Sequence, residues 1–401
     1  MVREAKKLRA RWIIVAMTKL IRTFARGALG ALILGAALAG PAYTHLRATT
    51  LLLRVQGGDA PTEGVLAWGA HAVDEESGTL ELPNGGRART RTYVPRGVAD
   101  PPAIVVAHGV HHTGVDEPRL QRFARALATA GVTVLTPELD GLKDYRVDAS
   151  NADTIGLAAE ALSRRAHRAS VGVLGLSFAG GLSLLAASDE RWSKSIAFVV
   201  SVGAHDDLPR VSRFFFDDEI ARPDGSTFRI HAHDYGAMVL VYGNVERFFP
   251  APDVPAAREA IRLWLWEDRD GARAAAARLS PASRAKVEKL FERKTDELKP
   301  ELLGLVESST PAMLPVSPHE HISGIRVPVF LLHGQGDDVI PSSETEWLAH
   351  DAPEGSVKNA LVSPAVSHVE LHGEPSAKDK WALVHFMAQV ISEADREIPT
   401  G

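Results

Sequence analysis

A serine flanked by small residues is the first candidate for chemistry in this chain of 401 residues. Ser177 lies in the segment Ser170 to Ala187, SVGVLGLSFAGGLSLLAA, two positions from both Gly175 and Ala179. The order of apolar, glycine-rich and helix-forming residues predicts a strand, a sharp turn and a helix. Such a turn strains the backbone at the serine and directs the N–H of Phe178 toward it. The segment therefore predicts a nucleophilic serine, and a plain strand-to-helix turn is the alternative.

A serine hydroxyl needs a base within hydrogen-bond reach and a carboxylate that orients this base. Two later loops contain these groups. Asp337 lies in His333 to Pro341, HGQGDDVIP, and His368 lies in Pro364 to Glu370, PAVSHVE. Each loop directly follows a predicted strand, as Ser177 does, and open α/β sheets place their sites at the carboxyl ends of strands. We therefore expect the three side chains to converge.

Alternating strands and helices surround the serine segment. Strands are predicted at Gly64 to Val73, Thr79 to Val94, Ala103 to Ala107, Val132 to Thr136, Ile196 to Val202, Val327 to Leu332 and Val357 to Val362. Helices are predicted at Pro118 to Ala130, Asn151 to Arg168, Ser343 to His350 and Ser376 to Ala394. This alternation predicts an α/β fold with a mostly parallel central sheet and helices on both faces. Thr44 to Pro61 shows little pattern and is predicted to be a linker.

The alternation is interrupted between residues 204 and 325. This region is rich in proline and contains two helical stretches, Arg258 to Arg278 and Pro281 to Lys299. Helices inserted after a strand are typical of a cap over the carboxyl edge of a sheet. Trp264 and Trp266 are expected to pack this cap onto the sheet.

With these features the chain resembles the α/β-hydrolases that carry a helical cap, from about Ile104 to the C-terminus apart from the cap. The resemblance rests on three motifs that occur in the family's order. They are the serine turn, the His108-Gly109 pair after a strand, and the run HGxxDxxIP at residues 333–341. It implies four regions, with residues 46–204 and 326–401 as the two parts of the core, 205–325 as the cap, and 1–45 as an N-terminal anchor or signal.

The resemblance also implies a role for each site residue. Ser177 would be the nucleophile, Asp337 the orienting acid and His368 the general base. The backbone N–H groups of Phe178 and Val110 would form the oxyanion hole. The implied activity is a serine hydrolase that cleaves a carboxylic ester or related acyl bond, with peptidase or thioesterase activity included. A non-catalytic binding protein of the same fold at a membrane surface is the alternative.

Two neighbouring residues compete for these roles. Asp338 adjoins Asp337, although the spacing to Pro341 favours Asp337. His372 follows His368 by four residues, although His368 lies nearer the end of the predicted strand. Asp337 and His368 are therefore the preferred assignments.

Clusters of histidine raise a metal site as a further alternative. These clusters are His108, His111 and His112; His231 and His233; and His319 and His321. A zinc enzyme needs three or four convergent ligands with one open position. Two clusters lie in the inserted region and the first overlaps the expected oxyanion loop. We therefore expect no metal and no cofactor, and histidines that face solvent or pack the cap.

The N-terminus differs in composition from the rest of the chain. Eight basic residues precede the uncharged stretch Gly27 to Tyr43, GALGALILGAALAGPAY. This stretch of 17 residues is at the short end of a membrane span, and the basic flank is expected to stay in the cytoplasm. Ala37-Leu38-Ala39 resembles a signal-peptidase site. We expect a membrane anchor, with the remaining chain on the extracytoplasmic side of the membrane. A cleaved signal, which would give a secreted or periplasmic protein, is the first alternative. A cytosolic protein in which this segment is amphipathic or buried is the second alternative.

Composition excludes several classes of chemistry. The chain contains no cysteine, so disulfides, thiolate metal sites and cysteine nucleophiles are ruled out. Its formal net charge of −5 gives no reason to expect nucleic acid as a partner. The expected partners are a small-molecule acyl substrate and, through the N-terminal segment, a membrane.

Overall fold

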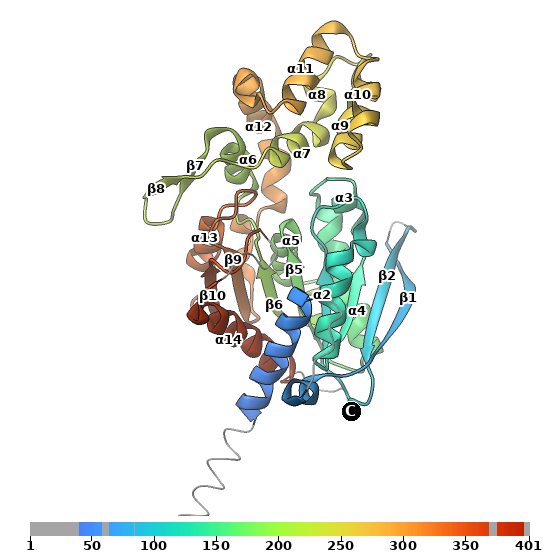
Figure 1. Cartoon of the computed structure of the whole chain (residues 1–401), viewed down its shortest axis with the longest axis vertical. Coiled ribbons are helices and arrows are strands. Elements are labelled where there is room, and N and C mark those ends of the chain that lie inside the picture. The colour runs from blue at the N-terminus through green and yellow to red at the C-terminus, as the bar shows by residue number, and fades with distance from the viewer. Residues whose placement is uncertain (1–39, 58–63, 84, 369–374, 397–401) are drawn as a thin grey trace, which may run out of the picture.

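The computed structural model describes residues 40–57, 64–83, 85–368 and 375–396. Its centre is an eight-stranded sheet in the order β1-β2-β4-β3-β5-β6-β9-β10 (Figure 1). The strands are β1 (Val73–Glu81), β2 (Arg87–Pro95), β3 (Ala103–Ala107), β4 (Thr133–Pro137), β5 (Val171–Leu176), β6 (Ile196–Val202), β9 (Val329–Gly334) and β10 (Val357–Ser363). β2 pairs antiparallel with β1 and β4, whereas all other neighbours are parallel. The predicted class, an α/β fold with a mostly parallel sheet, is confirmed.

Helices cover both faces of this sheet. Along β3, Val105 packs into one core cluster while Ile104 and Val106 pack into the other, because successive strand residues face opposite sides. α2 (Pro118–Thr129) and α14 (Ala377–Ala394) cover the face of Ile104. α4 (Ala149–Arg165), α5 (Phe178–Ser188) and α13 (Ser343–Asp351) cover the face of Val105.

The expectation of a linker is wrong for residues 44–57, and the rest of the predicted linker, residues 58–61, lies outside the described residues. Residues 40–57 are helical and lie along the face that α2 and α14 cover (Figure 1). We call this segment the N-terminal helix. Ala48 and Leu51 are fully buried in the core, and Arg47 donates to the Ala130 carbonyl at 2.7 Å and pairs with Asp395 at 2.5 Å. The helix is therefore an integral part of the core.

Two further predictions concern the N-terminal end of the chain. The strand predicted from Gly64 to Val73 is wrong, because Gly64–Gly69 forms a 3-10 helix (η1) and β1 begins only at Val73. Most of the predicted anchor, residues 27–39, lies outside the described residues. Within the described part of the chain, no helix combines the length and the apolar character needed to cross a membrane.

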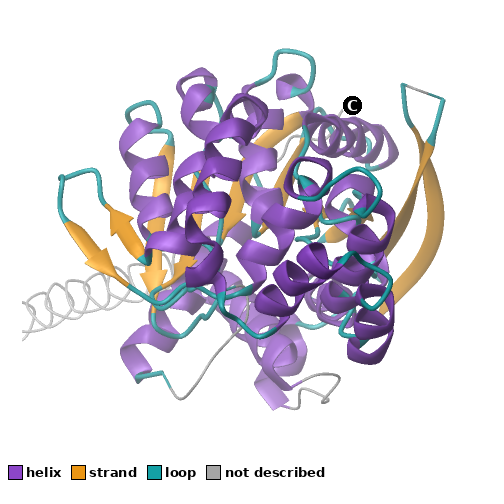
Figure 2. Ribbon diagram, turned by 90° about the horizontal axis from the view of Figure 1, so that it is seen from above, coloured by secondary structure: helices purple, strands orange, loops and turns teal. Residues whose placement is uncertain are grey.

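The region between β6 and β9 is mostly helical and lies over the carboxyl ends of the strands (Figures 1 and 2). Its main elements are α6 (Leu208–Asp217), the hairpin β7 (Glu219–Ala221) and β8 (Thr227–Arg229), α7 (Tyr235–Gly243), α8 (Val245–Phe248), α9 (Val254–Leu265), α10 (Arg269–Ala276), α11 (Pro281–Phe291) and α12 (Lys299–Met313). We refer to residues 205–325 as the cap. Trp264 stacks on Phe291 within the cap at 3.9 Å between ring centroids. Trp266 lies against His112 of the core, 5.4 Å between ring centroids.

Candidate active site

Ser177 occupies a strained turn between β5 and α5. Its backbone has φ 56° and ψ −133°, a region that residues with a side chain rarely adopt. A Cβ on Gly175 would lie 2.3 Å from the Ala179 carbonyl oxygen, so the turn accepts no side chain there. Gly175 is therefore required for the turn that presents the hydroxyl.

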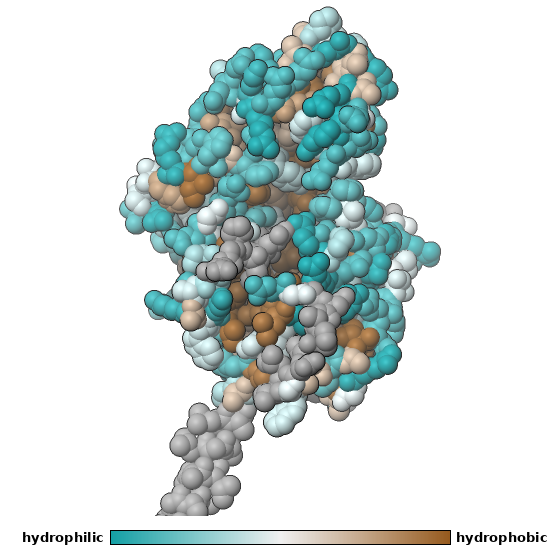
Figure 3. Space-filling model, viewed as in Figure 1, coloured by the Kyte–Doolittle hydropathy of each residue, from teal (hydrophilic) through white to brown (hydrophobic). Residues whose placement is uncertain are grey.

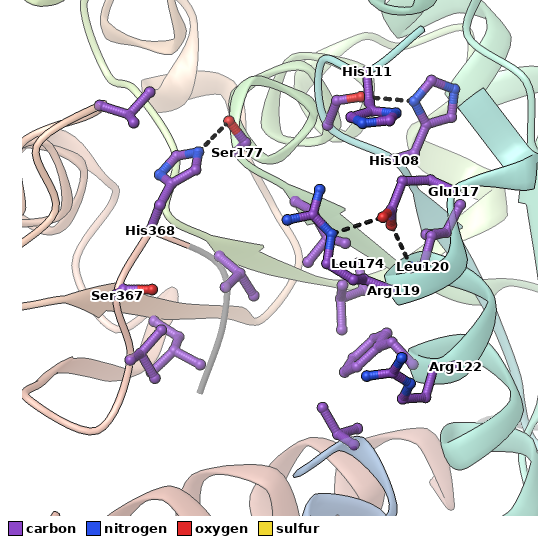
Figure 4. A pocket seen from close by; sticks show the side chains of 18 of the residues that line it. His108, His111, Glu117, Arg119, Leu120, Arg122, Leu174, Ser177, Ser367 and His368 are labelled. Atoms are coloured by element: carbon purple, nitrogen blue, oxygen red, sulfur yellow. Dashed lines mark hydrogen bonds and ion pairs between the residues drawn. The ribbon is translucent and has the colours of Figure 1, made fainter. Parts of the chain in front are cut away.

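The side chains of Ser177, His368 and Asp337 form a continuous hydrogen-bonded chain. His368 Nε2 lies 2.8 Å from Ser177 Oγ (Figure 4). His368 Nδ1 lies 2.6 Å from Asp337 Oδ2. Ser177 follows β5, Asp337 follows β9 and His368 follows β10, so three strand ends contribute one group each. The structure thus brings together the three residues expected to converge.

Asp337 is held as a carboxylate although it is completely buried. Burial alone would raise its pKa, but the charge of His368 and the hydrogen bonds from His333 and His368 lower the pKa of Asp337 well below its ordinary value. The N–H groups of Val339 and Ile340 also donate to Asp337 Oδ1, each at 2.9 Å. An ionised Asp337 can accept the Nδ1–H of His368 and leave Nε2 free to accept the Ser177 proton.

Asp338, the other candidate for the acid, makes different contacts from Asp337. Asp338 contributes its backbone carbonyl to the N–H of His233 at 2.8 Å, and its side chain is half-buried. His372 lies outside the described residues. The structure therefore places Asp337, and not its neighbour, beside the histidine.

Gly334 explains how the acid and the histidine approach each other. A Cβ on Gly334 would lie 1.7 Å from the Ser367 carbonyl oxygen, in the loop that carries His368. Only glycine allows the end of β9 to touch this loop. The sequence analysis included Gly334 in the HGxxDxxIP run without giving it this packing role.

Phe178 and Val110, whose N–H groups are the predicted oxyanion donors, line the same pocket as Ser177. Phe178 begins α5 directly after Ser177, and Gly109 packs so closely that an added Cβ would lie 3.2 Å from Ser177 Cβ. Among the described residues, the N–H groups of Phe178 and Val110 have no hydrogen-bond acceptor. Both donors therefore remain available for a negatively charged oxygen.

His108 fixes the loop that carries Val110. Its Nδ1 donates to the Gly109 carbonyl at 2.7 Å, and its Nε2 accepts from the Leu139 N–H at 2.9 Å. Burial lowers the pKa of His108, so the ring is neutral in the single tautomer that satisfies both contacts. This histidine supports the loop and does not act as a metal ligand.

Tyrosines connect the cap to the loops around the site. The Tyr235 hydroxyl donates to the Val110 carbonyl at 3.3 Å, and the Tyr145 hydroxyl donates to the Leu265 carbonyl at 3.0 Å. The Tyr242 hydroxyl donates to Asp144 at 2.7 Å. The sequence analysis missed these contacts because tyrosines far apart in the chain carry no local signal of their partners.

A cavity of about 520 Å³ opens beside Ser177 and His368. Its volume is typical of a small-molecule site. Figure 4 shows the cavity extending from Ser177 and His368 toward α14 and the N-terminal helix. α2 and the side chains of Arg119 and Arg122 lie across the cavity from His368. Apolar surface is visible in this hollow between the cap and the N-terminal helix (Figure 3). The reactive group therefore lies at one end of an extended pocket.

The three histidine clusters of the sequence do not combine with one another into a group of three potential ligands among the described residues, and only His319 joins such a group. In the described part of the chain, Asp206, His319 and Asp351 are the three potential ligands whose donor atoms lie within 4.8 Å of one another. His319 Nδ1 already binds Asp351 at 2.7 Å, and the guanidinium of Arg210 lies 2.9 Å from Asp206. Arg210 and His319 therefore contact the Oδ2 atom of Asp206, whereas its Oδ1 atom has no hydrogen-bond partner among the described residues.

Comparison with solved structures places this chain in the α/β-hydrolase fold. A candidate hydrolase from Legionella pneumophila has a TM-score of 0.53 and 14% identity, covering 87% of this chain and 95% of that chain. A puromycin-hydrolysing peptidase of Mycobacterium tuberculosis has a TM-score of 0.49 and 16% identity, covering 84% of this chain and 40% of that chain. The esterase domain of a Rhodothermus marinus protein has a TM-score of 0.43 and 15% identity, covering 81% of this chain and 99% of that chain.

These identities are too low to extend the likeness beyond the fold. The chain spans only about two fifths of the puromycin-hydrolysing peptidase and of an acylaminoacyl peptidase. No protein-family model matches the chain, and no curated protein matches its sequence.

Proposed function

We propose that this protein is a serine hydrolase that cleaves a carboxylic ester or related acyl bond. The observation that carries the proposal is the single imidazole of His368, which contacts Ser177 on one side and the buried Asp337 on the other. A base oriented by a carboxylate is what a serine hydroxyl needs to become nucleophilic at neutral pH. The α/β-hydrolase fold supports the proposal as an analogy.

In the proposed reaction, Ser177 Oγ attacks the substrate carbonyl carbon while its proton passes to His368 Nε2. The carbonyl oxygen becomes negative and is stabilised by the N–H groups of Phe178 and Val110. Collapse of the intermediate releases the alcohol, which takes the proton from His368. Water then attacks the acyl-enzyme with His368 again as the base, and Ser177 is restored.

A fluorophosphonate probe tests this proposal directly, because it phosphonylates only an activated serine. The purified full-length chain is expected to react, and Ser177→Ala is expected to abolish labelling. Ser188→Ala, at the far end of the same helix, serves as the matched control because its hydroxyl bonds the Leu184 carbonyl. A folded protein that resists the probe would identify a binding protein with the hydrolase fold instead.

We also propose that the segment before residue 40 anchors the protein, with the described part outside the cytoplasm. The support is the uncharged stretch after eight basic residues. Protease added to spheroplasts is expected to digest the hydrolase region. Complete protection would reverse the orientation, and recovery in the soluble fraction would refute the anchor.

A further inference from the structure

Three helices enclose the apolar part of the pocket. Leu120 and Phe123 come from α2, while Leu383 and Met387 come from α14. The third wall is the N-terminal helix, which contributes Leu52 and Val55. Their spacing from the buried Ala48 and Leu51 places all four on one side of the helix, since they follow the i, i+3, i+4, i+7 pattern.

The base of the pocket is equally apolar. It consists of residues at the carboxyl ends of the central strands, namely Leu174, Leu176, Val202 and Leu332. The charged lining residues are Glu117, Arg119 and Arg122. Glu117 and Arg119 flank the start of α2 and bind each other at 2.7 Å, so their charges satisfy one another. Arg122 lies further along α2 and is exposed to solvent, which leaves the interior between the helices mainly to apolar groups.

A peptide does not suit this interior. Each buried peptide unit brings one N–H and one C=O, and leaving them without partners is costly. A hydrocarbon chain brings no such groups and gains about 0.8 kcal/mol, close to a fourfold change in binding, for each methylene that leaves water.

The N-terminal helix is held firmly enough to act as a wall. Arg47 binds both the Ala130 carbonyl, just after α2, and Asp395, at the end of α14. One side chain thus ties the helix to both opposite walls. Leu52 and Val55, one to two turns further along, keep their positions relative to α2 and α14.

We propose that this pocket holds the aliphatic chain of the acyl group, and that the substrates are esters of medium- or long-chain fatty acids. The proposal rests on the hydrolase function proposed above, and it makes the N-terminal helix a substrate-binding element. Val55 and Leu52 limit the chain length, whereas the cap covers the side of the site nearest the ester.

Chain-length profiles of full-length variants test the proposal. The wild type is expected to prefer p-nitrophenyl decanoate over the acetate in kcat/KM. Val55→Phe is expected to lower the decanoate-to-acetate ratio at least about tenfold, the equivalent of about two lost methylenes. Val55→Ala, which enlarges the pocket, is expected to shift the preference toward longer esters. The two substitutions act in opposite directions, so a general loss of stability cannot imitate both.

Leu53→Phe is the matched control, because Leu53 is on the same helix but 44% exposed and absent from the pocket lining. Its decanoate-to-acetate ratio is expected to equal that of the wild type. Equal ratios in Val55→Phe and Leu53→Phe, or a preference for peptide amides over fatty esters, would overturn the proposal.

Binding of a fluorescent fatty acid separates this proposal from the catalytic one. Ser177→Ala protein is expected to bind the fatty acid, and adding Val55→Phe is expected to weaken binding at least about tenfold. Binding without fluorophosphonate labelling of the wild type would retain the chain pocket and reject the hydrolase. Labelling without any fatty-acid binding would retain the hydrolase and reject the chain pocket.

Discussion

Asp337 and Asp206 are both completely buried, and they follow the adjacent strands β9 and β6, yet they ionise in opposite ways. The pKa of Asp337 lies well below the ordinary value. Burial and the nearby carboxylate of Glu344 instead raise the pKa of Asp206 to about 7. Burial pushes both values upward, so the neighbours decide the direction.

The neighbours of the two aspartates differ in charge and in number. Asp337 accepts hydrogen bonds from His368 and from two backbone N–H groups. Asp206 forms an ion pair with the guanidinium of Arg210 at 2.9 Å, but Glu344 forms an ion pair with the same guanidinium at 2.7 Å. In the described structure the Oδ1 atom of Asp206 has no hydrogen-bond partner.

Position at a strand end therefore does not suffice to make an acid suitable for a catalytic triad. A triad acid must stay ionised to hold the imidazole in one tautomer, and Asp337 meets this condition. Asp206 is partly protonated near neutral pH and belongs to the ion-pair network at the base of the cap.

Replacement of the nucleophile or the base gives the largest expected loss of activity. The losses expected from substituting Asp337 and Asp206 are compared with this loss. Ser177→Ala and His368→Ala should each lower turnover of a short ester by at least about four orders of magnitude, since triad members act as a unit. Circular dichroism should show an unchanged fold. Activity within about tenfold of the wild type, or about 1.4 kcal/mol of barrier, would remove either residue from its role.

Exchanging each aspartate for asparagine tests the comparison itself. Asp337→Asn should lower kcat/KM by on the order of 10³ to 10⁴, because an amide favours the wrong tautomer of His368. Asp206→Asn should retain activity within about tenfold, since its side chain contacts no member of the site. The comparison fails if the two losses are similar.

The pH dependence of stability is expected to reveal the raised pKa of Asp206. Between about pH 4 and pH 7 the folded chain binds more protons at this site than the unfolded chain, so its contribution to the free energy of unfolding falls as pH rises. Asp206→Asn removes this loss. Relative to the wild type, the variant should therefore gain at least about 1 kcal/mol between pH 5 and pH 8.

Urea unfolding of the wild type and Asp206→Asn at both pH values measures this gain. The measured quantity is the change, between pH 5 and pH 8, of the stability difference between the variant and the wild type. Any cost of the substitution that does not depend on pH cancels in this quantity. The same stability difference at pH 5 and pH 8 would show that Asp206 does not titrate in this interval.

The smallest expected effect concerns the neighbour of the triad acid. Asp338→Asn should change kcat/KM by less than about threefold, or about 0.7 kcal/mol, because the contact of Asp338 to His233 uses its backbone carbonyl. Steady-state kinetics on the same short ester measure it. A loss greater than that of Asp337→Asn would transfer the acid role to Asp338.

The local features of the site were predictable because they depend on neighbours in the chain. Only glycine fits at position 175, and this requirement arises from residues four to eight positions away. Likewise, the alternation of apolar strands and helices is a short-range pattern, and outside the cap it predicted the main strands and helices after residue 100 to within a few residues. Within the cap it missed α6, α7, α8 and α12, and it merged α9 with α10. The order of Ser177, Asp337 and His368 then predicted which strand ends would meet.

Long-range packing decided the rest. The sequence does not predict most of the N-terminal helix, because its apolar residues form a single short stripe. Such a stripe is weak evidence for a helix without the α2 and α14 surfaces that bury it. The pKa of Asp337 depends on His368, a histidine in another loop. The pKa of Asp206 depends on Glu344, which is more than 100 residues away in the chain. The sequence by itself determined the serine turn and the order of the reactive groups. Only the tertiary structure decided which buried acid stays charged and which helices enclose the pocket, because these depend on contacts between segments that are distant in the chain.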